Sequence, residues 1–114
     1  MRSTALSGLL LAGLAACQPV VPPVASPGLP GLTLVPASGG LLVNGSGGRE
    51  IGFGRDQPGA LQTVARIEGM APRATSCGSG RQAFVTKGNL QLVFESGTFV
   101  GWTSGSDTAG RTCG

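Results

Sequence analysis

The sequence has 114 residues, a formal net charge of +3, 21 glycines and no histidine. Charged residues make up 11% of the chain and the basic ones are scattered, which excludes an extended nucleic-acid surface, since such a surface needs a concentrated basic patch with aromatic platforms. Abundant glycine and sparse charge favour loops, turns and short strands over long helices. The length fits one domain.

The first 16 residues have the parts of a secretory signal peptide. Arg2 supplies a positive charge, and the apolar run over residues 5–16 ends in small residues. Signal peptides have apolar runs of roughly 7–15 residues, whereas a membrane-spanning helix needs roughly 20. We therefore predict a cleaved signal over residues 1–16. Its removal leaves seven basic and five acidic side chains, an excess that would attract anionic lipid head groups only weakly.

A cysteine follows these small residues directly. The stretch Leu14-Ala15-Ala16-Cys17 closely resembles the lipobox of bacterial lipoproteins. In that family the cysteine thiol receives a diacylglyceryl group, and cleavage leaves the cysteine as the first residue, usually acylated on its amine as well. The resemblance implies that Cys17 is lipidated, and several acyl chains together anchor a protein stably. The alternative is an ordinary secreted protein with a cysteine near its cleavage site.

Residues 17–38 have the composition of a tether. They contain six of the eight prolines, and proline-rich chain favours an extended polyproline conformation with few packing contacts. We expect the tether to hold a folded domain, residues 39–114, away from the bilayer. The alternative is that Leu32–Val35 pairs as an edge strand before Pro36.

The domain is predicted to be α+β, with one short helix packed on a small antiparallel sheet of about five strands. A first hairpin is expected around Asn44-Gly45, because both residues accept positive φ. The helix is expected to start at Asp56 as N-cap and to stop at Gly69. Its apolar side is centred on Val64.

Three alternating segments follow the helix: 82–87, 90–95 and 98–103. The turns between them are short, which predicts an antiparallel meander. Residues 73–80 are expected to form a loop and residues 104–114 a polar tail. Strict alternation would place Phe99 on one face and Val100 and Trp102 on the other. Val100 and Trp102 are therefore the predicted partner surface, and the alternative buries Trp102 in the core or under the tail.

Two further cysteines lie in the domain. With Cys17 assigned to lipid, Cys77 and Cys113 form the one remaining pair, and export would place them in an oxidising compartment. We predict a disulfide between them, which a domain of this size needs as a staple. The alternatives are a redox pair or a metal site, which their wide separation and the absence of histidine disfavour.

The inventory of reactive side chains argues against catalysis. After residue 16 the chain has one lysine, five acids, and neither histidine nor tyrosine, so no Ser/His/Asp or Cys/His constellation can form. We predict a non-catalytic binding or structural module, without cofactor, metal or nucleic acid. Its expected partners are the membrane, through the lipid, and another envelope protein. The alternative is a small inhibitor or ligand-binding module that acts on an envelope hydrolase or a small molecule.

The order of elements carries a second resemblance. A hairpin, a helix that ends at Gly69, and three strands that close on Phe94–Trp102 look like small lipoproteins and secreted domains of bacteria. This order is more distantly similar to the SmpA/BamE-type outer-membrane lipoproteins, in which a helical part precedes an antiparallel sheet. Members of that class bind other envelope proteins. The resemblance implies a binding role on the periplasmic face of the outer membrane, and carries over no binding residue.

Overall fold

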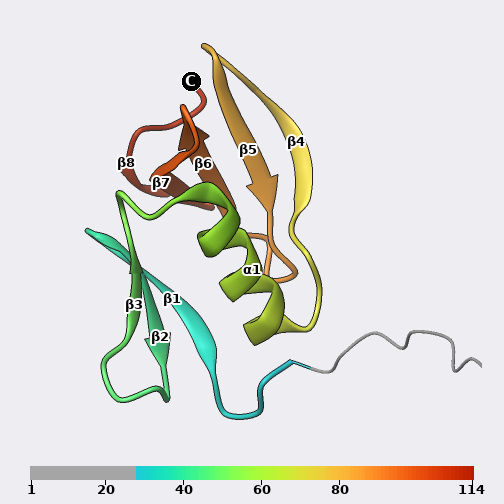
Figure 1. The fold of residues 1–114 in the computed structure, drawn as a ribbon. Coiled ribbons are helices and arrows are strands. Elements are labelled where there is room, and N and C mark those ends of the chain that lie inside the picture. Colours follow the sequence, from blue (N-terminus) through green and yellow to red (C-terminus); the bar gives the residue numbers. More distant parts are fainter. Residues whose placement is uncertain (1–27) are drawn as a thin grey trace, which may run out of the picture.

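The computed structural model describes residues 28–114. The predicted signal peptide, Cys17 and the first part of the expected tether lie outside the described residues. The described chain forms one helix and two antiparallel sheets (Figure 1). The elements are β1 (Thr33–Ala37), β2 (Gly40–Asn44), β3 (Glu50–Gly52), α1 (Gln57–Glu68), β4 (Arg73–Gly78), β5 (Arg81–Val85), β6 (Gln91–Glu95), β7 (Thr98–Ser104) and β8 (Asp107–Gly110).

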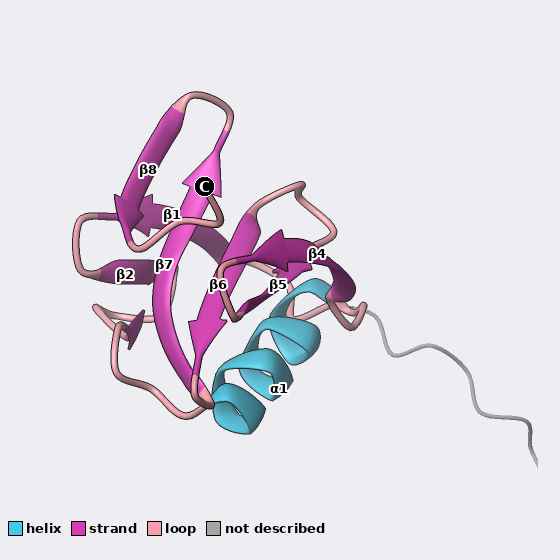
Figure 2. Cartoon of the chain, turned by 90° about the horizontal axis from the view of Figure 1, so that it is seen from above, coloured by secondary structure: helices cyan, strands magenta, loops and turns pink. Residues whose placement is uncertain are grey.

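The predicted α+β class with one helix is confirmed, but the single sheet of about five strands is not. Strands β1–β3 form a three-stranded sheet, here called sheet A, and β4–β8 form a five-stranded sheet, here called sheet B. In both sheets each strand pairs with the next one along the chain. Seen from above, α1 runs along one side of the molecule (Figure 2).

Helix α1 forms where its local signals predict it. The Asp56 carboxylate accepts a hydrogen bond of 2.8 Å from the Gly59 amide, which satisfies one of the free N–H groups of the first turn. Gly69 ends the helix in the left-handed conformation, with φ of 75°, which costs a glycine little. The helix buries Ala60, Val64 and Ile67, so its apolar side is centred on Val64 as predicted.

Sheet A begins earlier in the chain than the composition suggested. β1 lies inside residues 17–38, and it pairs with β2 over its whole length, from Thr33↔Asn44 to Ala37↔Gly40. Its proline content does not prevent this, because β1 is an edge strand and an edge can accommodate Pro36 without losing an internal hydrogen bond. The edge-strand alternative for Leu32–Val35 therefore describes this segment better than a tether does. The hairpin predicted around Asn44-Gly45 is the β2–β3 pair, with Leu41 opposite Ile51.

Sheet B contains the predicted meander as β5, β6 and β7, and it has one more strand at each edge. β4 lies where a loop was predicted, and β8 lies where a polar tail was predicted. Both expectations were wrong because edge strands that are mostly exposed show no alternation of apolar and polar residues.

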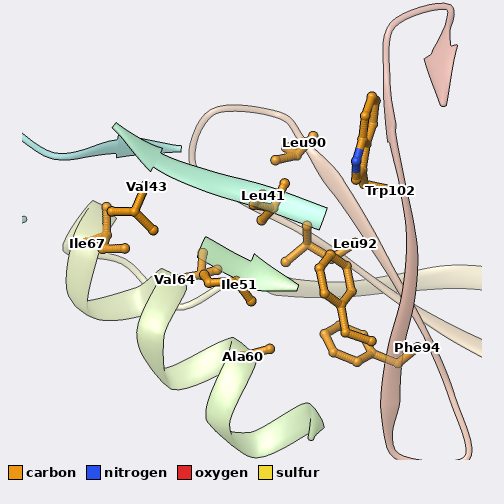
Figure 3. Packing of buried hydrophobic residues seen from close by; sticks show 11 residues of the cluster. Leu41, Val43, Ile51, Ala60, Val64, Ile67, Leu90, Leu92, Phe94 and Trp102 are labelled. Atoms are coloured by element: carbon orange, nitrogen blue, oxygen red, sulfur yellow. The ribbon is translucent and has the colours of Figure 1, made fainter. Parts of the chain in front are cut away.

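The hydrophobic core lies where α1, sheet A and sheet B meet (Figure 3). Its centre is aromatic: the Phe99 ring lies 5.1 Å from the Phe53 ring and 5.5 Å from the Phe94 ring, measured between centroids. The buried members of the cluster are Leu41, Val43, Ile51, Ala60, Val64, Ile67, Leu90, Leu92, Phe94, Phe99 and Trp102. One core thus joins all three layers, as a single small domain requires.

The chain enters this domain at the C-terminal end of α1 (Figure 1). The Leu29 amide donates a hydrogen bond of 3.1 Å to the Ile67 carbonyl, one of the last carbonyls of the helix. A side chain on Gly28 would collide with the same carbonyl, so only glycine fits this close approach. Gly28 and Leu29 are therefore fixed to the end of the helix before β1 begins.

Candidate binding surface

The surface predicted from Val100 and Trp102 is not present, because β7 contains a bulge. Phe94 pairs with Phe99, but the preceding residue, Val93, pairs with Gly101, so Val100 is the extra residue. The bulge breaks the alternation and turns Phe99 and Trp102 toward the same face. Trp102 is 6% exposed and belongs to the core. The alternative that buries Trp102 is therefore the correct one.

Trp102 also connects the two sheets. Its indole N–H donates a hydrogen bond of 2.7 Å to the Ala37 carbonyl at the end of β1. A buried indole needs such a partner, because an unpaired buried donor is costly. Trp102 thus holds sheet A against sheet B, and its role in the described structure is structural.

The substitution Trp102→Phe tests this contact. It keeps an aromatic ring in the core but removes the donor, and we expect the free energy of unfolding to fall by about 1 kcal/mol. Trp102→Ala also leaves a cavity, and it should cost about 3–5 kcal/mol. Urea unfolding followed by far-UV circular dichroism measures both. A Trp102→Phe variant as stable as the wild type would contradict a stabilising contribution from the hydrogen bond.

The C-terminal tail, residues 111–114, lies against part of the outer face of sheet B. Ala83 and Val93 are neighbours on this face and are almost completely buried. The Arg111 backbone lies against Gly101, where any side chain would collide with it. The predicted disulfide between Cys77 and Cys113 is present and fastens this tail to β4.

An ion-pair cluster holds the same tail. Arg81 donates to the Glu95 carboxylate at 3.1 Å and to the Thr112 carbonyl at 3.0 Å. The Arg111 guanidinium lies 3.7 Å from the same carboxylate. The part of this face around Ala83 and Val93 is therefore occupied by the chain itself.

A charged groove lies on the other side of the domain, between α1 and the β2–β3 hairpin. Its volume is about 540 Å³. We call it the arginine groove; it is lined by Leu29, Leu32, Val43, Ser46, Arg49, Glu50, Ile51, Arg55, Thr63, Arg66 and Ile67. The charged side chains of the lining are thus three arginines and one glutamate, and most of its other side chains are aliphatic. Two other grooves contain fewer charges: one beside Trp102 has only Asp107, and one beside the end of α1 has Glu68 and Lys87.

The three arginines differ in how firmly they are held. Arg55 donates to the Thr63 hydroxyl at 3.4 Å, and its guanidinium lies 3.7 Å from the Asp56 carboxylate. Within residues 28–114, Arg49 and Arg66 have no carboxylate within 4.0 Å of their guanidinium groups. Neither guanidinium group makes a side-chain hydrogen bond in this part of the chain, so within it both are available to an anion.

The groove also offers an apolar contact beside its charges. Val43, Ile51 and Ile67 belong to the core and form its base. Leu29 lines the groove and is 40% exposed, so it offers an aliphatic contact beside the arginines. An anion that carries an apolar group fits this combination better than a fully polar anion does.

No pattern in the sequence indicates this groove. Arg49, Arg55 and Arg66 are separated by six and eleven residues, and they looked scattered in the chain. The β2–β3 hairpin carries Arg49 and helix α1 carries Arg66, so only the packing of the hairpin on the helix brings them together.

In residues 28–114, no three His, Cys, Asp or Glu side chains gather closely enough to hold a metal ion. No helix in that part of the chain is both long and apolar enough to cross a membrane. Comparisons with protein-family models, curated proteins and solved structures find no match for the chain.

Proposed function

We propose that the protein is a lipid-anchored component of the bacterial cell envelope and that its domain is a non-catalytic binding module. The observation that carries the anchor is the lipobox-like stretch Leu14-Ala15-Ala16-Cys17 after a short apolar run. A diacylglyceryl group on Cys17, joined by acylation of its amine, would hold the protein on the periplasmic face of the outer membrane.

The fold supports a binding role for the domain. The disulfide fits export, because disulfides persist in oxidising compartments. The arginine groove presents Arg49 and Arg66, which have no carboxylate partner within residues 28–114, and such guanidinium groups suit recognition of an anion. We place the partner of this module in the envelope, within reach of the anchored chain.

Expression of the full chain in a bacterium fed labelled palmitate tests the anchor. We expect labelled protein in the membrane fraction, and Cys17→Ser should abolish the label and leave the longer precursor. The matched control is Cys77→Ser/Cys113→Ser, which should keep the label because it leaves Cys17 unchanged. Label that persists in Cys17→Ser, or an unlabelled wild-type chain, would contradict lipidation at Cys17.

A further inference from the structure

We infer that the arginine groove binds the phosphate head group of an anionic phospholipid in the membrane to which the chain is anchored. This inference rests on the proposed function, which places the domain beside a bilayer. It adds a second membrane contact, made by the folded domain itself.

The first argument is the concentration of free positive charge. Three of the seven basic residues outside the signal line one groove, and Arg49 and Arg66 have no carboxylate partner in residues 28–114. Guanidinium groups bind phosphate oxygens in bidentate geometry, and surface-exposed ones lose little solvation in doing so. Glu50 is the one acid that lines the groove, so the lining keeps an excess of positive charge.

The second argument is the position of the groove relative to the anchor. Leu29 and Leu32 line it, and Leu29 is fixed to the end of α1 where the chain enters the domain. Residue 28 follows Cys17 by eleven positions. At about 3.5 Å per residue the groove therefore lies at most about 40 Å along the chain from the lipid.

The third argument is the exposed leucine at the edge of the groove. Proteins that lie on membranes combine basic side chains with aliphatic ones that enter the boundary between head groups and acyl chains. Leu29 beside Arg49 and Arg66 reproduces this combination. An acidic peptide would satisfy the arginines, but only a lipid would also be delivered by the anchor, which holds the groove at a high effective concentration of head groups.

Vesicle binding tests the inference without the anchor. The processed chain, starting at residue 17 and carrying Cys17→Ser, is mixed with vesicles of phosphatidylglycerol and phosphatidylcholine in equal parts, or with phosphatidylcholine alone. We expect binding to the anionic vesicles only. Arg49→Gln/Arg66→Gln should weaken it about 25-fold, because each basic residue at an anionic surface contributes about fivefold. The matched control, Arg73→Gln/Arg111→Gln, loses the same charge from sheet B and the tail and should bind almost as the parent does.

Three results would overturn the inference. They are absence of binding to the anionic vesicles, equal weakening by the groove and control variants, and displacement from the vesicles by inorganic phosphate or poly-glutamate at low concentration. The last would assign the groove to a free anion or an acidic protein. Circular dichroism establishes that each variant is folded. Because the probe carries no lipid, palmitate labelling and vesicle binding can fail independently, which separates the anchor from the groove.

Discussion

Replacement of both disulfide cysteines, Cys77→Ser/Cys113→Ser, is expected to lower the free energy of unfolding by about 4 kcal/mol. The bond closes a loop with a sequence separation of 36 residues, and the loop-entropy model assigns about this value to a loop of that size. Small domains have only about 5–15 kcal/mol of stability in total. Without the bond the tail is also free to leave sheet B, which would expose Ala83 and Val93.

Urea unfolding, monitored by the fluorescence of the single tryptophan, measures this loss. Trp102 lies in the core, so its emission reports the whole domain. Wild-type protein treated with reductant is the matched control and should unfold at the same urea concentration as the double variant. A loss below about 1 kcal/mol would mean that the ion pairs of Glu95 hold the tail without the disulfide.

Phe99→Ala is expected to cost about 3–5 kcal/mol, because the substitution opens a cavity at the centre of the core. The Phe99 side chain is completely buried and contacts two other rings, Phe53 and Phe94. Its amide and carbonyl also pair with residues 54–55, so β7 and the start of α1 are joined at this position.

Phe84→Ala is the matched control, since Phe84 also packs against Phe94, at 5.7 Å, but is only partly buried. It should cost clearly less. If Phe99→Ala does not fold, Phe99→Leu keeps most of the volume and should cost about 1–1.5 kcal/mol. If Phe84→Ala lowered the free energy of unfolding as much as Phe99→Ala does, Phe99 would not be the centre of the core.

Local signals account for the parts of the fold that could be predicted. Asp56 caps the first turn of the helix and Gly69 ends the last one. Both effects are local, so the bounds of the helix can be predicted from the residues around them. The β2–β3 hairpin and the strands β5–β7 could be predicted because short turns separate segments in which apolar and polar residues alternate. The disulfide follows because only two cysteines remain once Cys17 is assigned elsewhere.

The remaining features depend on contacts that a linear pattern does not contain. β4 and β8 are exposed edge strands, so they lack an apolar period. The bulge at Val100 changes the face of Trp102, and the one local sign of it is Gly101, since glycine inside a strand often marks a bulge. The arginine groove exists only because a hairpin and a helix pack together.

The strand order of sheet B has a consequence for the route by which the domain folds. Every strand pairs with its neighbour in the chain, so the loops that must close are short and the sheet can assemble rapidly. The tail is different, because Cys113 must return to Cys77 across the completed sheet. Oxidation should therefore follow collapse, because the tail can cross to Cys77 only once sheet B has formed.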